Sequence, residues 1–125
     1  MRLYFAHPVS DYNRPREQKA LEAIRMAFPE CEIVNPNSDH HSMEYKRVGF
    51  RYFEDLAKSC QIVAAMPFPN GEWGMGVWKE AMTMAEVPEG VVLSLDSNGN
   101  FTALRPQSIR PLSIDETRRH VREAA

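Results

Sequence analysis

Ile62-Val63-Ala64-Ala65-Met66 is the stretch that decides the fold: an unbroken apolar run, closed by Pro67-Phe68-Pro69-Asn70-Gly71. An uninterrupted apolar run of this length is typical of a central strand that is covered on both of its faces. Proline, asparagine and glycine directly after it end the strand and begin a loop. The run therefore predicts a parallel sheet with helices on both sides.

The segments on either side of this run alternate between strand and helix patterns. Further strands are expected at residues 3–6, 32–34 and 91–95, with an antiparallel edge strand at 101–104 after the Asp96-Ser97-Asn98-Gly99 turn. Helices are expected at residues 14–28, at 43–59 with a weak point at Gly49, at 77–86, and from the Ser113/Glu116 capping box to the end of the chain. A polar loop is expected from Asn35 through His41. This alternation predicts one α/β domain over residues 1–125, a Rossmann-like or flavodoxin-like parallel sheet of four to five strands with right-handed crossovers.

Composition narrows the classes of function. The 125 residues are 43% hydrophobic and 26% charged, which is the balance of a globular domain. A net charge of -2 without a cluster of like charges argues against binding to duplex nucleic acid, and no apolar run reaches the ~18 residues of a membrane span. The start lacks a secretory apolar region, and Cys31 and Cys60 are too few for a disulfide framework. A cytoplasmic location is expected.

The loops after the strands are where such sheets bind ligands, and three of them are expected to meet: residues 7–14, 35–41 and 67–76. In the third loop Gly74 and Gly76 allow close backbone approach, and Glu80 is expected in the first turn of the next helix. There the helix dipole would stabilise an ionised carboxylate, which suits cleavage of an N-glycosidic bond through an oxocarbenium-like transition state. The alternative is that glutamate simply favours early helix positions.

Cofactor and metal motifs are not found. Lys79 stands where the third glycine of a dinucleotide fingerprint would be, and no Gly-Lys-Ser/Thr sequence exists, so neither a redox cofactor nor ATP is expected. Asp39-His40-His41 lacks a histidine pair at i,i+4 spacing, so no metal site is predicted there.

Three segments carry a resemblance to a known family: Tyr4-Phe5-Ala6-His7-Pro8-Val9-Ser10, Cys60-Gln61-Ile62-Val63-Ala64-Ala65, and the Gly74-Met75-Gly76 loop that leads to Glu80. In this order, over about residues 1 to 95, the chain resembles the nucleoside 2-deoxyribosyltransferase superfamily, which includes nucleoside deoxyribosyltransferases and nucleotide N-glycosidases. The resemblance implies an enzyme that cleaves the N-glycosidic bond of a nucleoside or nucleoside 5′-monophosphate by hydrolysis or base transfer. It implies Glu80 as the nucleophile, no cofactor, and a homo-oligomer (dimer or higher).

The match departs from the family at two places. Trp78 stands where a second glycine is common, and its bulk would reshape the sugar pocket. The family also carries a helper carboxylate on the helix before the central strand. Aligning the two sequences without a gap places Phe53 at that position, and Glu54 and Asp55 follow directly after it. Asp55 is the favoured helper, and the alternative is a solvated acidic helix face.

The resemblance also implies the binding residues. His7, Ser10 and Arg14, in the loop after the first strand, would hold the sugar or a 5′-phosphate, and Tyr4 would line the base pocket. The alternatives are a loop histidine capped by backbone for His7 and a solvated residue before Pro15 for Arg14. Apart from the resemblance, the aromatic residues Phe68, Trp73 and Trp78 around the Gly74 loop are candidates to stack on the base, because every base has a flat π-face; ordinary core packing is the alternative. The predicted partner is a small nucleoside or nucleotide. The rival function is a binding protein that holds a nucleotide or nucleotide-derived signal without cutting it.

Overall fold

The computed structural model describes residues 1–124, apart from the side chain of Asp39. Its strands are β1 (Arg2–Ala6), β2 (Glu32–Val34), β3 (Ile62–Ala65), β4 (Val91–Leu95) and β5 (Phe101–Ala103). Its helices are α1 (Pro15–Ala27), α2 (Asp39–Val48), α3 (Arg51–Lys58), α4 (Met75–Ala85) and α5 (Ile114–Ala124), with short 3-10 helices η1 (Val9–Asp11) and η2 (Pro106–Ser108). All five predicted strands are confirmed, each within one residue.

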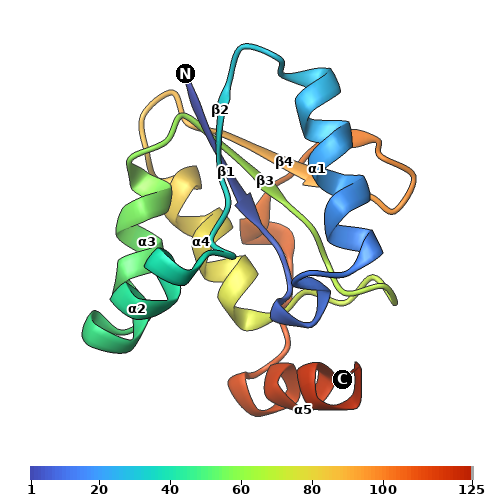
Figure 1. Cartoon of the computed structure of the whole chain (residues 1–125). Coiled ribbons are helices and arrows are strands. Elements are labelled where there is room, and N and C mark those ends of the chain that lie inside the picture. Colours follow the sequence, from blue (N-terminus) through green and yellow to red (C-terminus); the bar gives the residue numbers. More distant parts are fainter. Residues whose placement is uncertain (125) are drawn as a thin grey trace.

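The strands form one sheet in the order β2-β1-β3-β4-β5 (Figure 1). The first four are parallel, and β5 pairs antiparallel with β4, as the turn at residues 96–99 predicted. β3 lies in the centre and is buried along its whole length, which explains its unbroken apolar sequence. The prediction of a single, mostly parallel α/β domain is confirmed.

Helices cover both faces of the sheet. Tyr4 and Ala6 of β1 pack in a core with residues of α3 and α4, whereas Leu3 and Phe5 pack in a second core with residues of α1. Successive strand side chains point to opposite faces, so β1 contributes to both cores. Figure 1 shows α1 on one side of the sheet and α2, α3 and α4 on the other. The second of these faces also carries the candidate site.

The segment expected as one helix from residue 43 to 59 is two helices. Gly49 ends α2 with a φ of 83°, a conformation that glycine adopts without strain, so the weak point at Gly49 is a real break. The expected loop through His41 is wrong, because α2 already begins at Asp39. The Ser38 hydroxyl accepts the His41 backbone N–H at 3.1 Å and caps the helix.

The last helix lies beyond the carboxyl ends of the strands (Figure 1). It begins with the predicted capping box: the Ser113 N–H donates to Glu116 Oε1 at 3.0 Å and the Glu116 N–H donates to Ser113 Oγ at 3.1 Å. The Met75 N–H donates to Thr117 Oγ1 at 2.9 Å and joins α5 to the start of α4. Residue 125, the predicted end of α5, lies outside the described residues. Over the described part of the chain, helices are too short or too polar to cross a membrane.

Candidate active site

A cavity of about 400 Å³ opens where β1, β2 and β3 end, a volume typical of small-molecule sites. The three loops that were expected to meet there all contribute to it, through Tyr12, Pro36 and Phe68 among others. The remaining walls come from four helices, with Ser42, Tyr45 and Lys46 on α2, Phe53 on α3, Glu80 on α4, and Thr117 and Val121 on α5. The cavity is therefore mostly aromatic and apolar, with polar groups at a few points.

Glu80 is the buried carboxyl group of this cavity. Its side chain is 6% exposed, and the Tyr4 hydroxyl of β1 donates a hydrogen bond to its Oε2. The pKa of Glu80 is raised to about 8, mainly by burial; the Tyr4 hydrogen bond lowers this pKa, and the nearby Glu54 charge raises it. The neutral form of Glu80 is therefore favoured in the free protein at pH 7.

The expectation that Glu80 lies in the first turn of its helix is wrong. α4 begins at Met75 with Gly74 as its N-cap, two residues earlier than predicted, so Glu80 falls in the second turn. The dipole effect fades beyond the first turn, and burial controls the protonation of Glu80 instead. The carboxyl is held mainly in its neutral form rather than as the predicted dipole-stabilised anion.

Tyr4 keeps its proton over the whole physiological range. It is fully buried on β1, and burial together with the Glu80 charge raises its pKa well above the usual value. The Tyr4 hydroxyl therefore stays available as a donor, so its hydrogen bond fixes the position of Glu80 Oε2 and favours the ionised form of that carboxyl.

The helper carboxylate is not where it was expected. The Asp55 side chain is 59% exposed and pairs with Arg51 at 3.6 Å, so it points away from Glu80. Glu54 is half-buried and acts electrostatically on Glu80, although it does not line the cavity. Neighbouring helix positions differ by about 100° in direction, so Glu54 and Asp55 point different ways, and only Glu54 influences the pKa of Glu80.

A pair of variants tests this assignment. Glu54→Gln removes a negative charge near Glu80 and is expected to lower the Glu80 pKa, whereas Asp55→Asn makes the same chemical change one residue later and is expected to leave it alone. A carboxyl titration by carbon-13 NMR of glutamate-labelled protein reads the midpoint directly. An unmoved Glu80 midpoint in Glu54→Gln, or an equal shift in Asp55→Asn, contradicts the assignment.

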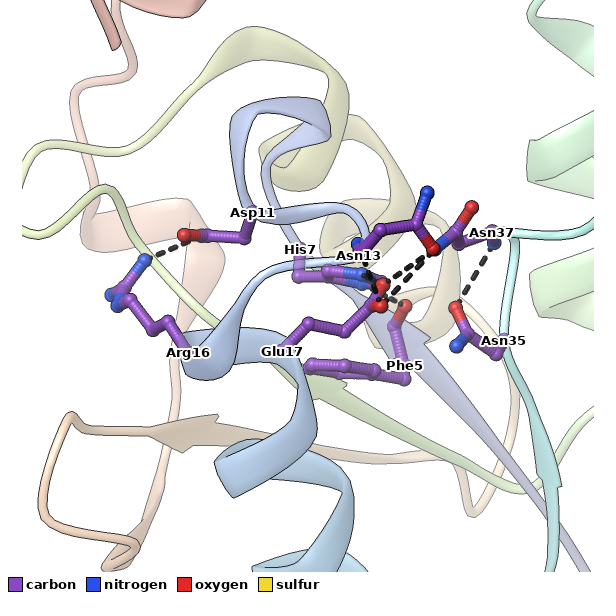
Figure 2. Close-up of polar contacts among 8 residues, drawn as sticks. All are labelled: Phe5, His7, Asp11, Asn13, Arg16, Glu17, Asn35 and Asn37. Carbon is purple, nitrogen blue, oxygen red and sulfur yellow. Dashed lines mark hydrogen bonds and ion pairs between the residues drawn. The ribbon is translucent and has the colours of Figure 1, made fainter. Parts of the chain in front are cut away.

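His7 lines the cavity but offers no N–H group to a ligand. Its Nδ1 lies 3.1 Å from the Phe5 carbonyl oxygen and its Nε2 lies 2.7 Å from Glu17 Oε2 (Figure 2). Because a carbonyl only accepts, Nδ1 carries a proton, and one further proton lies between Nε2 and Glu17. Burial lowers the pKa of His7, while the Glu17 partner raises it. The expected role of His7 as a phosphate donor does not agree with this geometry.

Three other expected binding residues lie outside the cavity. Ser10 is on η1 and does not line it, Arg14 Nη1 donates to the Ala124 carbonyl at 2.8 Å, and Trp78 Nε1 donates to the Pro106 carbonyl at 2.9 Å. The polar groups of Arg14 and Trp78 are thus used in packing α5 and η2 rather than in holding a ligand.

The residues around the Gly74 loop are placed as expected. Phe68, Gly74 and Gly76 all line the cavity. A Cβ atom on Gly74 would lie 3.1 Å from a ring carbon of Phe68 and 3.2 Å from Thr117 Cγ2, so a side chain there would push both walls apart. Trp73, in contrast, packs against the core between the sheet and α4.

The structure adds site residues that the sequence did not single out. Tyr45, Phe50 and Phe53 form an aromatic wall of the cavity, in a segment for which the sequence predicted a helix and no binding role. Lys46 is the only lysine or arginine among the described residues that line the cavity. Tyr12 lies in the first loop, and no local motif marked it. No signal in the sequence placed α5 over this end of the sheet.

No described group of three or more His, Cys, Asp or Glu side chains is arranged to hold a metal ion. Comparisons of the chain with protein-family models, with curated proteins and with solved structures found no match.

Proposed function

We propose that this chain is an enzyme that cleaves the N-glycosidic bond of a nucleoside or nucleoside 5′-monophosphate, with Glu80 at the sugar carbon C1′. The observation that carries the proposal is the buried Glu80 carboxyl, held by Tyr4 at one end of an aromatic-lined cavity. The strand order also supports it, because flavodoxin-like sheets share this order and bind nucleotides where it reverses, between β1 and β3. The resemblance of the sequence to the nucleoside 2-deoxyribosyltransferase superfamily points to the same reaction.

The proposed chemistry begins with the ionised form of Glu80. A Glu80 oxygen attacks C1′, the C1′–N bond breaks, and its electron pair leaves with the base, which takes up a proton. Water then hydrolyses the sugar ester, or a second base displaces Glu80. Positive charge that develops at the sugar favours an ionised carboxylate, so the transition state itself counteracts the raised pKa.

The cavity walls suit the rest of such a ligand. Tyr45, Phe50 and Phe53 offer ring faces on which any base can stack, and the choice among bases stays open. Lys46 supplies positive charge from α2, which favours a 5′-monophosphate over an uncharged nucleoside.

A second candidate is a protein that binds a nucleotide or nucleotide-derived signal without cutting it. One observation favours it: among the described residues Glu80 is the only carboxylate that lines the cavity. Retaining glycosidases use two carboxyl groups about 5 Å apart. The raised pKa of Glu80 also leaves a mostly neutral group at pH 7, which can donate a hydrogen bond to a ligand without attacking it.

A base-release panel separates the two candidates. The purified full chain is incubated with ribonucleosides, 2′-deoxyribonucleosides and their 5′-monophosphates, and free base is measured by chromatography from pH 5.5 to about 9. We expect base release from at least one substrate, with kcat/KM rising up to an apparent pKa near 8 as Glu80 ionises. Binding by calorimetry without release supports the binding protein instead. Neither binding nor release contradicts both candidates.

A further inference from the structure

A cluster of polar side chains centres on the buried carboxyl group of Glu17 on α1 (Figure 2). Glu17 is 1% exposed, and its Oε2 shares a proton with His7 Nε2 across 2.7 Å. Its carboxyl group also accepts hydrogen bonds from the Asn13 N–H at 3.0 Å and from Asn37 Nδ2 at 3.0 and 3.1 Å. His7, Asn13, Glu17 and Asn37 are named the Glu17 cluster below. Glu17, Asn13 and Asn37 do not line the cavity, so most of the cluster does not meet a ligand directly.

The Glu17 cluster holds the chain in an unusual conformation directly after Tyr12. Asn13 has a φ of 62°, a left-handed conformation that few residues other than glycine adopt, although asparagine is among the more tolerant ones. Glu17 accepts the Asn13 N–H, and Asn37 Nδ2 donates to Asn13 Oδ1 at 3.0 Å. A backbone outlier that is held by a buried carboxylate is typical of a segment whose position matters to function.

The same cluster also supports the Tyr12 side chain, through the His7 ring. The His7 ring, which stacks on Phe5, lies 4.9 Å from the Tyr12 ring between centroids. At the end of η1 the Tyr12 N–H donates to the Val9 carbonyl at 3.1 Å. Tyr12 is therefore held at its backbone by the Asn13 turn and at its ring by His7.

The held tyrosine ends in the cavity, in the same lining as Glu80 and Tyr4. Its hydroxyl forms no hydrogen bond with any described group of the protein, unlike that of Tyr4. Burial raises the pKa of Tyr12, and the charges of Glu80 and Glu17 raise it further, so the hydroxyl keeps its proton and lies within electrostatic reach of Glu80. The polar cluster thus presents an unpaired hydrogen-bond donor in the same cavity as the candidate catalytic carboxyl.

We propose that the Tyr12 hydroxyl donates a hydrogen bond to an acceptor atom of the bound nucleoside or nucleotide, next to the bond that Glu80 attacks, and that the Glu17 cluster positions it. Tyr12 is then a ligand-contacting residue, and Glu17 and Asn37 are positioning residues. This inference rests on the proposed ligand class and adds to it a specific contact.

Tyr12→Phe removes the hydroxyl alone and tests the contact. Ligand affinity is measured by calorimetry in a Glu80→Gln background, with the nucleoside or nucleotide that binds best in the panel, so that turnover does not obscure binding. We expect about tenfold weaker binding, the usual size of one lost hydrogen bond to a ligand, with a Tm within about 1 °C because no protein partner is lost. Tyr52→Phe removes a hydroxyl on α3, at a residue that does not line the cavity, and is expected to bind normally.

Asn37→Ala and Glu17→Gln test the positioning. Asn37→Ala removes the hydrogen-bond donors to both Glu17 and Asn13, so it is expected to weaken ligand binding. In the double variant with Tyr12→Phe, the loss of affinity should be smaller than the product of the losses in the two single variants. Glu17→Gln retains acceptors for Asn13 and Asn37, and its amide can donate to Nε2 of a neutral His7, so affinity should stay within about twofold. A residue with only a structural role would lower the Tm without this non-additivity in affinity.

The outcomes separate this inference from the proposed function. Unchanged affinity in Tyr12→Phe, or a large loss of Tm in that variant, overturns the contact even where base release is observed. Ligand binding without base release overturns the enzyme proposal, yet a tenfold effect of Tyr12→Phe on that binding still supports the contact. If nothing in the panel binds, both proposals are overturned.

Discussion

Glu80→Gln is expected to reduce base release by about a thousandfold or more, the scale seen when a nucleophile is removed from an active site. Glutamine has the size of glutamate, and its carbonyl oxygen can still accept the Tyr4 hydrogen bond. It cannot attack C1′ or carry the negative charge that stabilises the developing cation. The fold and the shape of the cavity should persist while turnover is lost.

The measurement is the rate of free base formation with the best substrate of the panel, at the pH where the unmodified protein is most active. Glu86→Gln is the matched control, because it makes the same change at the end of the same helix, on a residue that does not line the cavity. We expect its rate to stay within about twofold of the unmodified protein. Retention of a tenth of the activity in Glu80→Gln would rule out Glu80 as the nucleophile.

The same substitution is expected to stabilise the folded protein, and to do so more as the pH rises. The unfolded chain releases the Glu80 proton near pH 4.5, whereas the folded protein holds it until about pH 8. Between these values the folded state binds more protons than the unfolded state, so the stability of the unmodified protein falls as the pH increases. The amide introduced by Glu80→Gln does not titrate, so the variant escapes this loss.

The expected difference in the free energy of unfolding is small at pH 5 and of the order of several kcal/mol at pH 8, after which it levels off. For a domain of this size that corresponds to a Tm increase of the order of 10 °C. Thermal unfolding by circular dichroism from pH 5 to about 9 measures it, with Glu86→Gln again as the control. A difference that stays flat over this range would mean that Glu80 is not buried as the structure has it. This test does not depend on the activity of the protein.

These two expectations together explain why a buried carboxyl at this position indicates a function. A glutamate that is 6% exposed and has one hydrogen-bond partner weakens the fold at neutral pH, and an apolar or amide side chain would be more stable there. Proteins retain such groups mainly at sites where chemistry or recognition needs them. The Glu17 cluster is different, because its carboxylate has several donors and serves to hold a loop.

Local patterns were enough to predict most of the elements. The apolar run at residues 62–66 predicted the central strand, and the Ser113/Glu116 pair predicted the start of α5, because strand burial and helix capping depend on neighbours in the sequence. The sequence also indicated that the loops after the strands would share a site. The larger errors were at the helix starts at Asp39 and Met75, where a serine cap and a glycine N-cap extended each helix.

The tertiary structure alone decided which side chains meet in the site. Tyr4 and Glu80 are 76 residues apart and become hydrogen-bond partners because α4 packs on the face of β1 that carries Tyr4. The direction of Glu54 and Asp55, the use of both His7 nitrogens, and the position of Tyr12 likewise depend on how elements pack against one another. The sequence by itself therefore determined the fold class and the end of the sheet that holds the site. Packing decided its chemistry, because a pKa and a hydrogen bond depend on distant neighbours that a local pattern does not contain.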